Sequence, residues 1–177
     1  YLQFRRRFLH THGGPFNGGG SGGTFRIGDV EMTLSPGKNP EKIPDLSPWS
    51  VKYFPQNSNT LGHIRWMMQK DLLKQDMCLI GEPGPARRWL ALMFCHYAQR
   101  EAQTLTLTRD TTEADIKQRK EIRNGSLCYL DQAAVSAALK GHILIIDGLE
   151  RAERNVLPVI NNLLENREMH LDNGMMR

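Results

Sequence analysis

Apolar residues follow two different periods along the chain from Leu61 onward. Where they recur every three or four positions, they predict an amphipathic helix. Where four or five residues are apolar throughout, or alternate with polar residues, they predict a strand. The predicted helices span residues 61–72, 86–100, 132–139 and 156–164, and the predicted strands span residues 77–80, 104–108 and 142–146.

Polar residues and glycine at the ends of these segments support the assignment. Thr112 and Asp115 have the spacing of a capping box, which predicts a further helix directly after Thr112. Asp131 and Asn155 are predicted N-caps of the two helices that follow them. Gly141 is predicted to end the helix over residues 132–139, because glycine accepts the left-handed backbone of a helix end.

The alternation of strands and helices predicts the class of fold. We expect an α/β protein with a parallel sheet that helices cover on both faces. Ligands bind such sheets at the carboxyl ends of the strands. The loops after Ile80 and Ile146 are therefore expected to meet at one edge of the sheet.

The first 60 residues differ in composition from the rest. Residues 1–23 are rich in Arg, lack acidic residues and end in a Gly/Ser run, which predicts a flexible basic tail. Residues 24–60 combine a short strand with a proline-rich connector, and residues 61–177 form the main folded domain. Two interpretations of the tail stay open: the remnant of a mitochondrial transit peptide, or a disordered tail without a targeting role. Because the chain begins at Tyr1, we expect a fragment or a processed product.

The net charge of +4 comes entirely from the first 28 residues, so residues 29–177 are neutral. A neutral folded part argues against a nucleic-acid partner. No run approaches about 18 apolar residues, so no membrane span is expected. Cys78, Cys95 and Cys128 lie in apolar stretches without Cys-x-x-Cys spacing, and we expect buried free thiols in a reducing compartment.

The segment after the predicted strand over residues 77–80 has the setting of a phosphate-binding loop. The usual pattern, G-x-x-x-x-G-K-[ST], lets backbone N–H groups and a helix N-terminus converge on phosphate oxygens. The eight matching positions are Gly81, Glu82, Pro83, Gly84, Pro85, Ala86, Arg87 and Arg88.

Several of these positions depart from the pattern. Ala86 replaces the second glycine and adds one methyl group, while Pro83 and Pro85 each remove a backbone donor. Arg87 keeps the positive charge of the usual lysine on a larger, planar group, and Arg88 has no hydroxyl for a magnesium ion. Nucleotide binding is the favoured hypothesis, and a plain strand–turn–helix connection is the alternative.

The apolar run that ends at Asp147 has the form of a Walker B strand, whose aspartate holds Mg²⁺. Asp147 is therefore the candidate metal ligand and catalytic residue, and a strand-end turn residue is the alternative. Many such ATPases follow this aspartate with a glutamate that orients the attacking water, but here Gly148 follows. Glu150 is the remaining catalytic candidate, and an ion pair with Arg151 or Arg154 is its alternative role.

The other candidate chemistry is weaker. The basic run over residues 117–120 is predicted to be a solvated helix face, with contact to a phosphate or a neighbouring subunit as the alternative. The histidines do not cluster with cysteines at metal-ligand spacing, and no G-x-S-x-G motif indicates a hydrolase nucleophile.

The two motifs and the sequence between them resemble the dynein-related, midasin-like branch of the AAA+ ATPases. The resemblance rests on residues 81–88, 107–119 and 147–169. It implies a P-loop NTPase fold, a three-layer sandwich with a parallel sheet, in a mechanochemical ATPase that uses ATP and Mg²⁺. It also implies neighbouring AAA+ subunits or modules of a ring as partners, and a location in the mitochondrial matrix.

By motif position, the resemblance assigns residues 81–88 to Walker A and Asp147 to Walker B. A complete AAA+ module continues into further strands, an arginine finger and a helical lid. We therefore expect a domain truncated before the last strands and the lid, poorly stable alone. The expected function is ATP binding and ATP hydrolysis, with hydrolysis at this site weakened by the altered motifs. The alternatives are a nucleotide-binding module without hydrolysis and a structural or interaction module.

Overall fold

The structure, a computed structural model, describes five stretches of the chain: residues 2–3, 23–34, 37–46, 58–82 and 84–172. They divide into two compact units, each described by itself. We call them the N-terminal unit, up to Ala102, and the C-terminal unit, from Gln103 onward. Most of the predicted basic tail lies outside the described residues.

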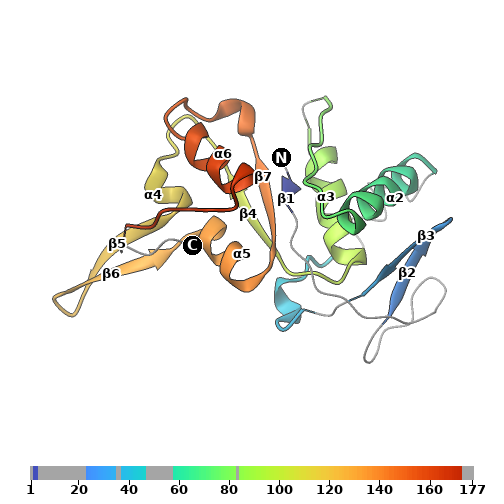
Figure 1. Ribbon diagram of the computed structural model, residues 1–177, viewed down its shortest axis with the longest axis horizontal. Helices are drawn as coiled ribbons and strands as arrows, with labels where there is room; N and C mark the ends of the chain where they lie inside the picture. Colours follow the sequence, from blue (N-terminus) through green and yellow to red (C-terminus); the bar gives the residue numbers. More distant parts are fainter. Residues whose placement is uncertain (1, 4–22, 35–36, 47–57, 83, 173–177) are drawn as a thin grey trace. The chain divides into compact units, whose positions relative to one another are not determined.

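The N-terminal unit combines two helices with a small antiparallel hairpin (Figure 1). Its elements are β1 (Leu2–Gln3), β2 (Thr24–Ile27), β3 (Val30–Thr33), η1 (Pro40–Lys42), α2 (Ser58–Leu72) and α3 (Ala86–Tyr97). Helix α2 packs against both α3 and β3. Much of the buried apolar surface comes from methionine, a flexible side chain that fills irregular gaps. The fully or largely buried apolar residues are Val30, Met32, Ile64, Met67, Met68, Met77, Ala91, Met93, Phe94, Cys95 and Ala98.

A buried ion pair joins the end of α2 to the chain after α3. Arg100 Nη1 donates to Asp71 Oδ1 at 3.0 Å, and only 2% of the Asp71 side chain is exposed. Removing one partner of such a pair leaves a buried charge uncompensated, at a cost of about 3–5 kcal/mol. The pair therefore holds the end of α2 against the chain that directly follows α3.

The C-terminal unit is built around two neighbouring strands, β4 and β7. Its elements are β4 (Ala102–Thr106), α4 (Glu113–Ile116), β5 (Gln118–Arg123), β6 (Ser126–Asp131), α5 (Ala133–Lys140), β7 (Ile143–Asp147), η2 (Leu149–Arg151) and α6 (Leu157–Glu165). The N–H of Leu107, directly after β4, donates to the carbonyl of Asp147, the last residue of β7, at 2.8 Å. Both strands finish at the same edge, so they are parallel, as the sequence predicts.

One hydrophobic core holds this unit together. It draws residues from β4, β7 and all three α-helices, which confirms the mixed α/β packing. Its fully buried members include Leu107, Ile116 and Val156. Residues 143–146 of β7 are buried throughout, as expected for a strand covered on both faces.

A second hairpin, β5–β6, extends away from the rest of the C-terminal unit (Figure 1). Its strands pair from Gln118 opposite Asp131 to Arg123 opposite Ser126. The turn between them is Asn124-Gly125, and both residues have positive φ, 51° and 76°. This is the type I′ turn that Asn-Gly favours.

The main helices lie where the sequence predicts them, in α2, α3, α5 and α6. The predicted strand over residues 104–108 begins and ends two residues earlier, as β4. Two of the predicted signals for helix ends are confirmed. Thr112 and Asp115 form a reciprocal capping box at α4, and Gly141 ends α5 with a φ of 73°.

Three local predictions are wrong. Residues 77–80 do not form a strand: only Met77 makes a bridge and is buried, while Ile80 is 89% exposed. A four-residue apolar run becomes a strand only where another strand pairs with it. Asp131 ends β6 and does not cap α5, and Val156, not Asn155, occupies the N-cap of α6.

The basic run over residues 117–120 is also not a helix face, because β5 begins at Gln118.

The prediction of three buried thiols holds only for Cys95, since Cys78 and Cys128 are exposed. Within the described residues, no helix is both long enough and apolar enough to cross a membrane.

Candidate nucleotide-binding site

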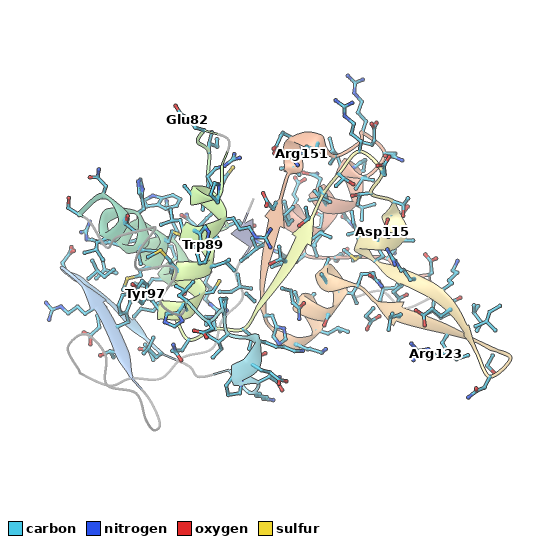
Figure 2. All side chains as sticks on the ribbon, turned by 180° about the vertical axis from the view of Figure 1, so that it is seen from behind. Glu82, Trp89, Tyr97, Asp115, Arg123 and Arg151 are labelled. Carbon is cyan, nitrogen blue, oxygen red and sulfur yellow. The ribbon has the colours of Figure 1, made fainter. Side chains whose placement is uncertain are left out.

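The loop of the Walker A candidate leads directly into α3. Its described residues from Gly81 to Ala86 are exposed, and Figure 2 shows Glu82 at the far end of the loop, away from Trp89 on the helix. Pro83 lies outside the described residues. The loop is therefore an exposed turn at a helix N-terminus, which is the local setting that phosphate binding requires.

Two residues set the shape of this loop. Gly84 has a φ of 151°, a conformation that side chains rarely allow, so the glycine is required by the backbone. Pro85 is the N-cap of α3, with φ −74° and ψ −15°, and its carbonyl accepts a hydrogen bond from the Trp89 N–H at 2.9 Å. The N–H groups of Ala86 and Arg87 belong to the first turn of α3, at the end of the helix that follows the loop.

Arg87 is the cation best placed beside this loop. A Cβ built on Gly81 would lie 3.8 Å from Arg87 Cδ, so the aliphatic part of the arginine passes alongside Gly81. Arg87 is half-buried, whereas Arg88 is exposed. A guanidinium is a planar, delocalised cation, so Arg87 brings a positive charge to the first turn of α3.

The Walker B candidate lies in the C-terminal unit, at the end of β7. Asp147 is half-buried, after four buried residues. Its carbonyl is held by the Leu107 N–H. The strand thus fixes the backbone of Asp147 at the carboxyl edge of the parallel sheet, where ligands bind in such folds.

Gly148 cannot be replaced by a residue with a side chain in this backbone. Its φ is 80°, and a Cβ built on it would lie 2.7 Å from the carbonyl oxygen of Leu107. Such a distance is shorter than any real Cβ contact, and the obstructing atom belongs to the backbone of the adjacent strand end. A glutamate at this position would require β4 and β7 to separate locally.

Glu150 is not placed to replace the glutamate that Gly148 excludes. It lies in η2, its side chain is 62% exposed, and its Oε1 is 3.8 Å from Arg151 Nε. This favours the ion-pair interpretation of Glu150. An exposed pair of this kind contributes about 0–1 kcal/mol.

A pair of hydroxyl groups near Asp147 was not predicted from the sequence. Thr108 follows Leu107 at the same sheet edge, and its N–H donates to Thr111 Oγ1 at 2.8 Å. The two hydroxyl oxygens are 3.1 Å apart. The available signal was the polar, threonine-rich loop directly after a predicted strand.

The two candidate motifs lie in different compact units, each of which is described by itself. Residues 81–88 belong to the N-terminal unit and Asp147 to the C-terminal unit. That both loops serve one nucleotide stays a prediction. No group of three His, Cys, Asp or Glu residues suited to a metal ion occurs in the described part of the chain.

The fold and the two motifs agree with a comparison to known families. Residues 76–177, more than half of the chain, match the model of the AAA domain of the dynein-related subfamily. The chain therefore belongs to the dynein-related AAA family, as its motifs indicated.

A curated relative from Mus musculus, von Willebrand factor A domain-containing protein 8, is 53% identical over 154 residues. The match covers 87% of this chain but only 8% of the relative. The chain thus spans a small part of the length of that relative.

Proposed function

We propose that this chain is an ATP-binding module of a dynein-related AAA+ ATPase. The observation that carries the proposal is the loop over residues 81–88. Its described residues support the proposal with a glycine at positive φ in Gly84, the N-terminus of α3 and the adjacent charge of Arg87. Family membership supports nucleotide as the ligand.

Asp147 is the proposed Mg²⁺ ligand. Magnesium is usually bound by one or two carboxylates together with phosphate oxygens and water, so a single aspartate at a strand end fits this role. Arg88 supplies no hydroxyl to the ion, so Asp147 is the candidate protein ligand from the two motifs.

Hydrolysis at this site is proposed to be slow. Gly148 leaves no room for the glutamate that orients the attacking water, and Glu150 is exposed beside Arg151. The module would then hold ATP or ADP, while faster turnover depends on groups from neighbouring AAA+ modules or subunits. A ring of such modules in the mitochondrial matrix, with this chain as the first ATPase module of a protein like the mouse relative, completes the proposal.

The test is a thermal melt of the 177-residue chain with and without Mg-ATP, Mg-ADP and EDTA. A ligand at about 100 times its Kd adds about 2.7 kcal/mol, a shift of several degrees. Arg87→Ala should abolish most of the shift. The control, Lys140→Ala, removes a positive charge at the end of α5, outside both motifs, and should retain the shift.

Each outcome decides a separate point. A cooperative melt without any nucleotide shift contradicts the proposal. A shift that survives Arg87→Ala contradicts the assigned phosphate contact. For turnover, phosphate release near the background rate in wild-type and Asp147→Asn chains supports slow hydrolysis, whereas fast release abolished by Asp147→Asn makes this module a working ATPase.

A further inference from the structure

The hairpin β5–β6 exposes three apolar side chains that the proposed nucleotide site does not use. Ile122 is 80% exposed, Leu127 56% and Leu130 43%. Ile122 and Leu127 lie opposite each other across the hairpin, so they form one apolar pair near its tip. Among the described residues, the hairpin is a sheet of only two strands.

The two strands of the hairpin differ in how their outer edges are protected. Natural edge strands avoid pairing with other chains by carrying charged residues or proline. Strand β5 follows this rule with four charged residues of six. Strand β6, Ser-Leu-Cys-Tyr-Leu-Asp, has a single charge at its last residue, Asp131, and no proline.

The cations of β5 are already engaged within the chain. Arg119 pairs with Asp115, Lys120 with Asp172 and Arg123 with Glu121. These ion pairs leave no strong net field around the hairpin to favour a highly charged partner. The β6 edge is apolar and nearly uncharged, so it instead suits pairing with another strand that is apolar and nearly uncharged.

We propose that β6 pairs antiparallel with β6 of a second copy of this chain, centred on Cys128. The two hairpins then form a four-stranded sheet. In this register Leu127 lies beside Tyr129 of the second copy, an aliphatic–aromatic pair that stabilises sheets. Asp131 lies opposite Gly125 of the second copy, so no charge faces a like charge.

The pairing does not depend on nucleotide binding, and it is weak. In this register residues 126–130 of β6 pair with the same residues of the second copy, five from each. The area that such a short seam buries falls below the ~1,200–2,000 Å² of a standard stable interface. The dimer should therefore form only at high protein concentration. Sedimentation velocity over a wide concentration range, without nucleotide, is the suitable measurement.

The first test uses the central cysteine. In the 177-residue chain with Cys78→Ser, mild oxidation should give a disulfide-linked dimer on a non-reducing gel, because the two Cys128 residues lie directly opposite each other in this register. Cys128→Ser should remove it. A monomer after oxidation, with Cys128 still titratable as a free thiol, overturns the proposed register.

The second test changes the charge at the centre. Cys128→Lys places like charges opposite each other and should raise the dimer Kd roughly five- to tenfold. Within its own hairpin, position 128 faces Glu121, so the lysine gains a partner and the hairpin itself stays folded. The matched control, Ile122→Lys on β5, should leave the dimer Kd nearly unchanged.

A mixture of two variants with opposite charges at position 128 should restore the dimer. Chains with Cys128→Lys and chains with Cys128→Glu and Glu121→Gln should form mixed dimers more readily than either alone, since opposite charges then meet at the centre. The Glu121→Gln change removes the like charge that would face the new glutamate within its own hairpin. Equal association of each variant alone and of the mixture, or weakening only by Ile122→Lys, would place the partner surface elsewhere and refute the β6 pairing.

Discussion

Gly148 shows how one residue without a side chain controls the chemistry near it. Two features exclude other residues there: the positive φ, and the Leu107 carbonyl oxygen, which would lie 2.7 Å from an added Cβ. The position directly after Asp147 is therefore unable to offer a carboxylate. At the residue scale, the close approach of the chain ends after β4 and β7 is incompatible with a glutamate at position 148.

The first prediction separates the two restrictions on Gly148. Gly148→Ala should lower the free energy of unfolding by about 3 kcal/mol, since left-handed backbone strain of about 1–2 kcal/mol adds to the steric conflict. Chemical denaturation of the two chains measures the difference. Gly141→Ala is the matched control: its φ is 73°, but nothing lies within 4 Å of the added Cβ, so only about 1 kcal/mol is expected. Equal losses for both variants would show that the Leu107 contact is relaxed in solution.

At the scale of elements, the capping box at α4 links a helix to the hairpin. The Thr112 N–H donates to Asp115 Oδ2 at 3.0 Å, and the Thr112 hydroxyl donates to the same oxygen. Arg119, at the start of β5, donates to Asp115 Oδ1 through its guanidinium. These hydrogen bonds lower the pKa of Asp115 from 3.8 to about 2, and the bond from the Thr112 backbone N–H has the largest effect.

The second prediction concerns the pH dependence that follows. The folded state binds the Asp115 proton less tightly than the unfolded state, so its stabilisation is complete above about pH 4 and is lost as pH falls toward 2. Asp115→Asn should cost about 1 kcal/mol at neutral pH and flatten the stability profile between about pH 4 and 2. Denaturation midpoints measured across this range check it.

The control for this prediction lies in the same helix. Glu113→Gln removes an acid that pairs with Lys117 but takes no part in the capping box. It should change the free energy of unfolding by less than about 0.5 kcal/mol. A comparable pH effect from Glu113→Gln would assign the acid dependence to general charge in α4.

At the scale of the whole molecule, each unit has its own buried apolar residues, and the two candidate motifs lie in different units. The N-terminal unit holds the phosphate loop and Arg87, and the C-terminal unit holds Asp147. The three thiols differ in burial, since Cys78 and Cys128 are exposed. Cys95 is buried in the N-terminal unit, and burial raises the pKa of its thiol to about 12.

The third prediction is a count of reactive thiols. Two of the three cysteines, Cys78 and Cys128, should react with an aromatic disulfide reagent in the folded, fully reduced chain. Cys95 should react only after unfolding, because a thiolate forms poorly in an apolar interior. Chains with Cys78→Ser or Cys128→Ser should each lose one fast thiol. Rapid reaction of all three would mean that the α2–α3 core opens readily.

Much of the fold could be predicted because its signals are local. Helix periodicity, the Thr112–Asp115 box and the Gly141 stop each lie within a few residues of the element they define. The Asn124-Gly125 turn was an equally local signal for the β5–β6 hairpin. It was missed because the charged run before it was assigned to a helix.

The sequence by itself determined the family, the positions of the two candidate motifs and the positions of the main helices, since each depends on residues close together in the chain. The tertiary structure decided what depends on distant segments. The carbonyl oxygen of Leu107, after another strand, excludes a side chain at Gly148. Cys95 is buried while Cys78 is exposed. Residues 77–80 lack the pairing that would make them a strand. Strand pairing and burial arise from contacts between remote parts of a chain, which no local pattern specifies.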